Sequence, residues 1–419
     1  MKNLTFSGVE LPDGGITDLH VANGHFVSEA AAGAEAVDAE GLVALPGLVD
    51  LHTHLREPGR EDAETVASGS KAAVRGGYTC IFAMPNTDPV TDTAEDAEHV
   101  ADLGVAADLA QVIPIGAITK GLLGNELADL GLMHGSRANV RVFSDDGSCV
   151  QDAQVMRRAL EWVSRFDGVL AQHAQDASLA DGSACCHEGE LSGRLGLPGW
   201  PPVAESVIIA RDVQLAEVTG SRLHVCHITS AEGVEVIRWA KARGINVTAE
   251  VTPHHLYFTT EELRGYDTTF KVNPPLRTDE HVEALRTALA DGTIDTVSTD
   301  HAPHAAHDKD HAFVDARPGM LGLEQALGVV IETMLERLGW SGIAERMSIA
   351  PARIGGATTQ GRGLGVGAPA NMVLINPARR AIVDKMASAS LSRNNPYHGR
   401  DLPDPVEMTV GAGRVLYRR

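Results

Sequence analysis

The chain has few cysteines, no basic block and no long apolar run. Its five cysteines are odd in number and lack CxxC spacing, which predicts reduced thiols in a cytoplasmic protein. Neither a transmembrane helix nor a signal peptide is expected, because no apolar run reaches about 18 residues and the first residues lack an apolar core. Lysine and arginine number 35 against 56 acidic residues, a net charge of −21. This acidity argues against nucleic acid and anionic membranes as partners.

One stretch, Pro46–Gly59 (PGLVDLHTHLREPG), carries a pattern with chemical meaning. Its apolar run predicts a short buried strand that ends in His52-Thr53-His54. Alternate residues of a strand share a face, so both imidazoles point the same way and could hold zinc or a similar ion. Arg56 follows as a cation suited to a substrate carboxylate. An isolated HxH is equally typical of ordinary surface histidines, so other motifs in the chain must decide whether this pair binds metal.

The middle of the chain repeats a strand–helix pattern. Eight apolar, β-rich segments lie at residues 48–51, 79–84, 111–115, 139–143, 168–171, 222–226, 246–249 and 295–298. Amphipathic stretches such as 63–75, 151–165, 205–217 and 232–243 separate them. This alternation predicts a (β/α)₈ barrel over residues 45–360, and no GxGxxG follows a strand to favour a doubly wound sheet. Residues 1–44 and 361–419 alternate in polarity and predict one discontinuous β-rich domain.

Histidines and aspartates follow several of these predicted strands. In a barrel such residues meet at one mouth, formed by the carboxyl ends of the strands. Six of them supply four imidazoles and two carboxylates: His52, His54, Asp146, His173, His227 and Asp300. One catalytic ion needs three or four protein ligands, so six predict two ions that share a carboxylate and make water nucleophilic. Asp300 is the candidate general base on attack and general acid toward the leaving nitrogen.

An ordered series of motifs carries a family resemblance: DLHTHLREPG, AMPNTDPVTD, FSDDG, VCHITS, TAEVTPHH, VNPPLR and STDHAPH. Together they resemble the class I dihydroorotases of the amidohydrolase superfamily. The resemblance implies reversible cyclisation of N-carbamoyl-L-aspartate to L-dihydroorotate in pyrimidine synthesis, with two Zn²⁺ on the six residues above. It places Arg56, Asn86 and His304 on the substrate carboxylate and Asn273 near the ring. The backbone of Arg317–Gly322, including Pro318 and Gly319, would approach the ring. The family also implies a homodimer and admits association with aspartate transcarbamoylase.

Two other functions compete with this interpretation. Hydantoinases and allantoinases share the barrel but typically bridge their metals with a carboxylated lysine. Residues 121–240 contain no lysine, and Lys120 is expected to be exposed, so Asp146 is predicted to be the metal bridge. A non-catalytic homologue that only partners the transcarbamoylase is expected to lose metal ligands, and none is missing here.

Other polar residues receive plainer predictions. Asp145 should face away from Asp146 and be structural. The adjacent Cys185 and Cys186 are expected to be unreactive. His301, His307 and His311 are assigned to a solvated, mobile loop beside His304. His254 and His255 are expected to shape the backbone rather than bind metal.

Overall fold

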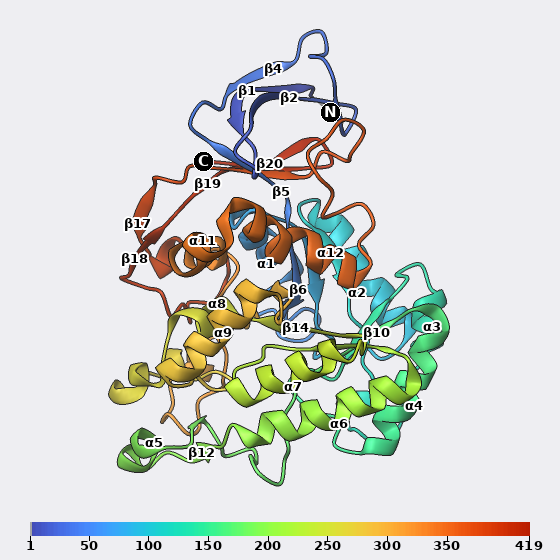
Figure 1. Ribbon diagram of the computed structural model, residues 1–419, viewed down its shortest axis with the longest axis vertical. Helices are drawn as coiled ribbons and strands as arrows, with labels where there is room; N and C mark the ends of the chain where they lie inside the picture. The colour runs from blue at the N-terminus through green and yellow to red at the C-terminus, as the bar shows by residue number, and fades with distance from the viewer. Residues whose placement is uncertain (1) are drawn as a thin grey trace.

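A computed structural model describes residues 2–419 (Figure 1). Each predicted strand segment of the middle region overlaps an observed strand, so these assignments are confirmed. The strands are β6 (Leu48–Thr53), β7 (Tyr78–Ala83), β8 (Gln111–Pro114), β9 (Val142–Ser144), β10 (Val169–Gln172), β13 (Arg222–Val225), β14 (Val247–Val251) and β15 (Thr296–Val297). Every residue of β6 and β7 is buried, because both faces of these strands are covered.

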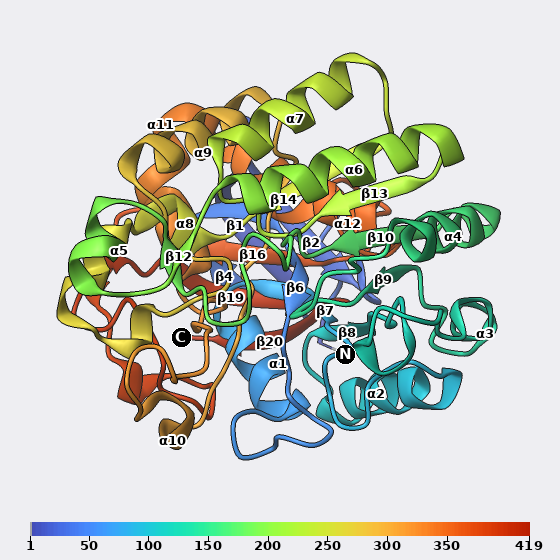
Figure 2. The same ribbon diagram turned by 90° about the horizontal axis from the view of Figure 1, so that it is seen from below.

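Helices lie around these strands (Figure 2). The longer ones are α1 (Val66–Arg75), α2 (Ala94–Ala107), α4 (Ala153–Val163), α6 (Val203–Thr219), α7 (Ala231–Ala242), α9 (Asp279–Asp291) and α11 (Ala326–Ala344). The shorter ones are α3 (Leu130–Gly135), α5 (Glu190–Leu195), α8 (Pro253–Tyr257), α10 (Ala306–Lys309) and α12 (Ala350–Gly355). Short 3₁₀ segments are η1 (Lys120–Leu122), η2 (Ser164–Phe166), η3 (Thr260–Gly265), η4 (Thr268–Phe270) and η6 (Lys385–Ala387), and η5 (Glu345–Ile349) is a π-helical segment. Helix α1 begins later than predicted because Thr65 and Ser68 form a capping box.

The eight strands are parallel and follow the chain order. Strands β6-β7-β8 form one sheet, and β15-β14-β13-β10-β9 form another. Isolated parallel bridges join their facing edges, Gly116 to Phe143 at one seam and Thr53 to His301 at the other. The carboxyl ends of all eight strands therefore lie on the same side of the molecule.

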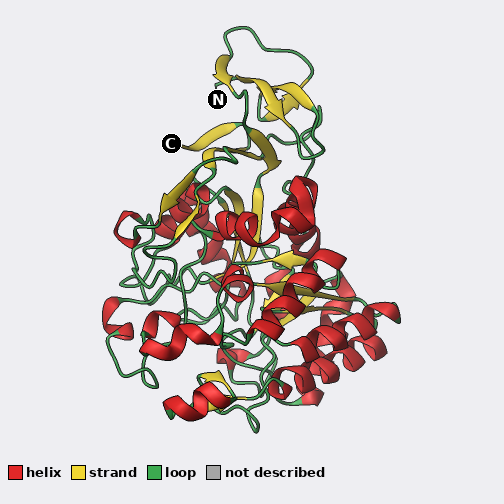
Figure 3. Ribbon diagram, turned by 60° about the vertical axis from the view of Figure 1, so that its left-hand side comes forward, coloured by secondary structure: helices red, strands yellow, loops and turns green. Residues whose placement is uncertain are grey.

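A third sheet contains strands from both ends of the chain, and it lies apart from most of the helices (Figure 3). Its members are β1 (Leu4–Glu10), β2 (Ile16–Ala22), β3 (His25–Val27), β4 (Glu35–Asp38), β5 (Val43–Pro46), β16 (Met372–Ile375), β19 (Val406–Gly411) and β20 (Arg414–Arg418). Strand β5 pairs with β16 and leads through Gly47 directly into β6, which carries His52 and ends just before His54. The terminal sheet thereby holds the start of β6 in place.

Two short strand pairs lie outside both regions. They are β11 (Cys186–His187) with β12 (Gly199–Trp200), and β17 (Arg380–Ile382) with β18 (Asp401–Pro403). Residues 384–400, between β17 and β18, contact the loops at the strand ends. Among residues 2–419, no helix combines the length and apolarity needed to span a bilayer.

Candidate metal centre

The six predicted metal ligands converge at the carboxyl ends of five strands. His52 lies on β6 and His54 just beyond it, and the other four follow β9, β10, β13 and β15. Their exposure is at most 4 %, although four are histidines and two are aspartates. Buried ionisable groups persist where they are paired with one another or bind metal. The convergence agrees with the arrangement expected from the strand order.

The ligand atoms form two groups. In the first, Nε2 of His54 and Nε2 of His52 lie 3.0 and 3.6 Å from Oδ1 of Asp300. In the second, Nδ1 of His173 lies 3.0 Å from Nε2 of His227. The donor atoms within each group, with Asp146 counted in the second, lie within 4.8 Å of one another. Two groups of this size match two ion sites better than one.

Asp146 lies between the two groups and faces both. Its Oδ2 is 3.3 Å from His52 Nε2 and 3.4 Å from His54 Nε2. Its Oδ1 is 3.1 Å from His227 Nε2 and 3.6 Å from His173 Nδ1. Each carboxylate oxygen therefore points at a different pair of imidazoles, as a bridging ligand requires. Lys120, the alternative bridge, is half exposed and pairs with Glu126.

Three side chains outside this set fix the histidine rings. Nδ1 of His52 lies 2.6 Å from Glu250 Oε1, and Nδ1 of His54 lies 2.9 Å from Asn86 Oδ1. Nε2 of His173 lies 3.0 Å from Gln175 Oε1. Because a neutral imidazole donates through one nitrogen, each contact leaves the opposite nitrogen as a lone pair facing the centre. Sequence reasoning missed Glu250, although a glutamate inside the apolar run of β14 is a visible signal.

The charges inside the centre are strongly coupled. Burial opposes ionisation of Asp146, but the charge of His52 and hydrogen bonds from His173 and His227 hold its pKa well below the ordinary value. Burial opposes protonation of His52, but Asp146 and Glu250 raise its pKa well above the ordinary value. The carboxylates of Asp146 and Glu250 thus favour a positive charge at His52, which either a proton or a bound cation can supply.

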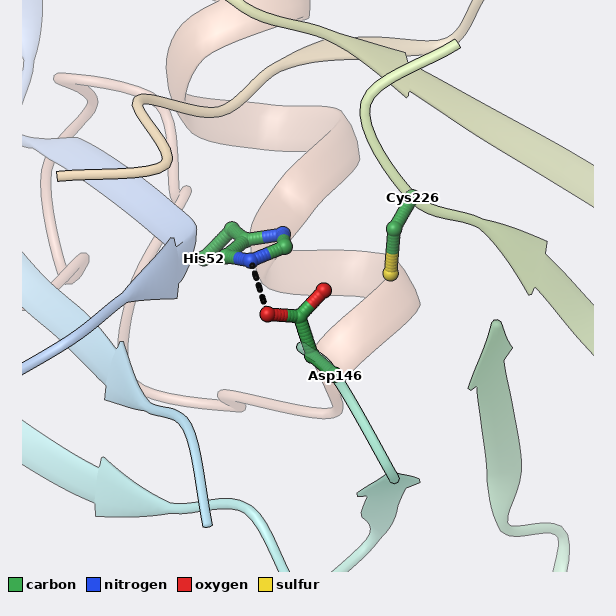
Figure 4. A group of neighbouring side chains, drawn as sticks. All are labelled: His52, Asp146 and Cys226. Carbon is green, nitrogen blue, oxygen red and sulfur yellow. Dashed lines mark ion pairs between the residues drawn. The ribbon is translucent and has the colours of Figure 1, made fainter. Parts of the chain in front are cut away.

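Cys226 adds a thiol beside His52 and Asp146 (Figure 4). Burial, with Glu250 adding to it, raises the pKa of this thiol to about 12, so it remains protonated at neutral pH. Its sulfur forms, with donor atoms of His52 and Asp146, a third group whose atoms lie within 4.8 Å of one another.

The residues present fit a pair of divalent ions. Among residues 2–419, His52 Nε2 is fully buried and has no hydrogen-bond partner, so a cation is the natural partner for its lone pair. Four imidazoles and two carboxylates are a donor set typical of zinc and other first-row divalent metals.

The predicted substrate residues surround this centre. Arg56 donates from Nε to Pro303 O at 3.0 Å, and His304 Nε2 lies 2.8 Å from Pro318 O. Burial, helped by the Arg56 charge, lowers the pKa of His304 to about 2, so its ring is neutral and donates to that carbonyl. Gly319 has φ +144°, and a Cβ there would come within 2.8 Å of His304 Nε2, so only glycine fits.

A cavity of about 410 Å³ adjoins the second group of ligands. Asn273 and Pro318 line it together with Gly147, which follows Asp146, and Gln175, which orients His173. Asn273 and Pro318 therefore share one cavity, whereas Asn86 lies against His54.

Several plainer predictions are also resolved. Asp145 points away from the centre and accepts from the backbone of Ile118 and Thr119, which confirms its structural role. The assignment of His301 to a solvated loop was wrong. Its side chain is 1 % exposed, lies 3.4 Å from Glu64 Oε2 and accepts from Gly322 N at 3.2 Å. Polar partners distant in sequence bury this ring, and the local pattern gave no sign of them.

The chain is similar to known proteins over almost its whole length. A family profile described as dihydro-orotase-like matches residues 41–233. The dihydroorotase of Streptomyces coelicolor is 59 % identical over 387 residues, covering 92 % of this chain and 90 % of that protein. The dihydroorotase of Mycobacterium tuberculosis is 50 % identical with the same coverage of both chains.

Solved structures support the fold. The L-hydantoinase (dihydropyrimidinase) of Arthrobacter aurescens aligns with a TM-score of 0.86 at 24 % identity, covering 99 % of this chain and 96 % of the other. At that identity the likeness speaks for the architecture, and the closer relatives identify the family. On the identity shared with both dihydroorotases across nine-tenths of its length, the chain belongs to the dihydroorotase family.

Proposed function

We propose that the protein is a dihydroorotase, which interconverts N-carbamoyl-L-aspartate and L-dihydroorotate. The observation that carries this proposal is the two-part centre joined by Asp146, in a chain 59 % identical to a dihydroorotase. A non-catalytic homologue is disfavoured because all six predicted ligands lie together.

The centre is proposed to hold two Zn²⁺ ions. His52, His54 and Asp300 would hold one, His173 and His227 would hold the other, and Asp146 would contact both. When bound, such ions supply positive charge that polarises a carbonyl and lowers the pKa of water. Asp146 already offers two carboxylate oxygens in the bridging position, so no carboxylated lysine is needed.

Asp300 is the proposed proton carrier. In ring closure the ureido nitrogen bonds to the side-chain carboxyl carbon, a carbon–oxygen bond breaks, and one water leaves with net uptake of one proton. Asp300 would take the proton from nitrogen and deliver one to the departing oxygen. In hydrolysis it would take a proton from water and return one to the ring nitrogen. Burial disfavours its charged form, yet hydrogen bonding from His54 lowers its pKa, so it is ready to act as a base.

The substrate carboxylate is proposed to bind Arg56, with His304 and Asn86 beside it. Burial lowers the pKa of Arg56 to about 10, which still leaves the guanidinium charged at neutral pH. Its donation to Pro303 O fixes the orientation of the group. Asn273 and the backbone at Pro318 and Gly319 would contact the ring from the adjoining cavity.

We also propose that the eight strands form one closed (β/α)₈ barrel, because parallel bridges occur at both seams between the two sheets. In this division residues 45–360 form the catalytic domain, and residues 1–44 with 361–419 form the discontinuous β-rich domain.

One assay separates the competing functions. Protein reconstituted with a defined amount of zinc is tested on dihydroorotate, hydantoin and allantoin. We expect turnover of dihydroorotate alone, in both directions. Preferred hydrolysis of hydantoin or allantoin would overturn the substrate assignment, and inactivity on all three with full metal content would favour the non-catalytic alternative.

A further inference from the structure

The segment 388–395 reverses the usual relation between polarity and burial. Ser390, Ser392 and Asn394 are at most 4 % exposed, whereas Leu391 between them is 48 % exposed. Alternate residues of an extended segment face the same side, so the polar side chains turn inward together. A buried face made of serine and asparagine is stable only where each group finds a hydrogen-bond partner.

Those partners lie in loops at the strand ends. Ser390 Oγ and the backbone of Leu391 donate to Glu64, and Ser392 Oγ donates to Ala63 O at 2.6 Å. The segment 388–395, called the strap below, is thereby attached to the loop between β6 and α1. This loop begins with His54, so the strap is attached to the same loop as one predicted ligand.

Asn394 connects two further loops through a single carboxamide. Its Nδ2 donates to Ala302 O at 2.9 Å and to Gly319 O at 3.1 Å, and its Oδ1 accepts from His304 N at 3.1 Å. Its own carbonyl accepts from Leu321 N at 3.1 Å. Both hydrogen bonds donated by Nδ2 and the one accepted by Oδ1 are made with the loops that carry His304 and Gly319.

We propose that Asn394 is a positioning residue for substrate binding. It holds the loop after β15 against the segment at residues 318–321, so that His304 and the Pro318–Gly319 backbone face the substrate together. This inference rests on the proposed function, since it takes those residues as substrate contacts. Asn394 does not itself touch the reacting atoms; it sets the geometry of groups that do.

The neighbouring residue provides a matched control. Asn395 is 3 % exposed, almost the same as Asn394, but its Nδ2 donates to Gln325 Oε1 at 2.9 Å and its Oδ1 accepts from Tyr397 N at 3.0 Å. Its loss therefore costs similar buried hydrogen bonds without releasing the His304 or Gly319 loops. Any effect specific to Asn394→Ala reports on positioning rather than on general destabilisation.

The experiment compares full-length, zinc-loaded Asn394→Ala, Asn394→Asp and Asn395→Ala proteins. We expect both Asn394 variants to raise KM for dihydroorotate by about tenfold or more, because carbonyls in the two loops lose their donor. The metal content should be unchanged, and kcat should fall by a smaller factor than KM rises. Asn394→Asp keeps the side-chain size and the acceptor for His304 N, so it remains informative if the alanine variant does not fold. Asn395→Ala should leave KM near the wild-type value.

Amide hydrogen exchange measures the effect on the two loops without depending on enzyme activity. In Asn394→Ala the amides of Ala302, His304 and residues 319–321 should exchange faster than in Asn395→Ala. Normal KM in both Asn394 variants, or equal KM changes in the Asn394 and Asn395 variants, would overturn the inference. If the wild-type protein does not act on dihydroorotate, the proposed function is wrong. Unchanged amide exchange in these loops would refute the positioning role of Asn394, whatever the activity.

Discussion

Glu250→Gln is predicted to weaken zinc binding without disturbing the fold. Glu250 is 1 % exposed, its Oε1 lies 2.6 Å from His52 Nδ1, and its Oε2 lies 3.1 Å from His224 Nε2. Glutamine keeps the length and an acceptor oxygen for His52 but removes the negative charge. The variant therefore removes the electrostatic effect of Glu250 on His52 while it keeps the hydrogen bond that orients the His52 ring.

The magnitude follows from the kind of bond that is lost. A hydrogen bond to a charged group contributes about 1.5–3 kcal/mol, which corresponds to about 10- to 100-fold in affinity. Mutation of groups that orient metal-bound histidines typically weakens metal affinity over the same range, about 10- to 100-fold. The buried position of Glu250 excludes screening by solvent, so we expect an effect inside this range rather than below it.

The assay is competition for zinc between the protein and a chelator, with thermal unfolding measured in parallel. Asp212→Asn is the control, because Asp212 is equally buried but accepts from Gln172 and Arg211 and contacts no imidazole. A zinc dissociation constant within about threefold of wild type in Glu250→Gln would refute the reasoning. An equal loss of zinc affinity in Asp212→Asn would refute it as well, since the effect would then be general.

Four further predictions test the site directly. Arg56→Ala should weaken dihydroorotate binding by about 1.5–3 kcal/mol while the zinc is retained. Normal binding would show that Arg56 is not part of the substrate site. Arg60→Ala is the control, because it loses only an ion pair with Asp308 and other surface contacts. Asp300→Asn should lower turnover in both directions by about 100-fold or more; near-normal turnover at full metal content would exclude the base role. In the wild type, ring closure takes up a proton, so lower pH should favour synthesis and higher pH hydrolysis in equilibrium measurements. Lys120→Ala should keep its zinc and activity, and apo-protein should recover without bicarbonate; a bicarbonate requirement would show that a carboxylated lysine is involved.

The convergence of the six proposed ligands could be predicted from the sequence because parallel strands bring their carboxyl ends together. Once eight strands are placed in order, His173 after one and His227 after another must lie near each other, whatever the loops do. The same reasoning separated Asp145 from Asp146, since adjacent residues face opposite sides. Backbone periodicity alone decides these positions, so a single sequence was sufficient.

The groups that orient the ligands were not predictable in this way. Glu250 meets His52 across 198 residues of chain, and Asn394 meets Ala302 across 92. Nothing local distinguishes the strap from a solvated loop, and its exposed Leu391 is the opposite of what hydrophobicity predicts. Such contacts depend on how loops pack on one another, which strand order does not determine.

One signal for these supporting groups nevertheless lies in the sequence. Asp50 and Glu250 are charged residues inside runs that otherwise read as buried strands, and both have 1 % exposure or less. A carboxylate in that setting must be hydrogen-bonded, so it predicts a polar partner even when the partner is unknown. Asp50 accepts from Thr299 N at 3.0 Å and from Thr299 Oγ1 at 2.6 Å, which fixes the backbone one residue before Asp300. A charged residue inside an apolar strand, such as Asp50 or Glu250, therefore indicates a side chain that holds a strand end of the site in place. The histidines that follow the strands indicate the metal centre itself.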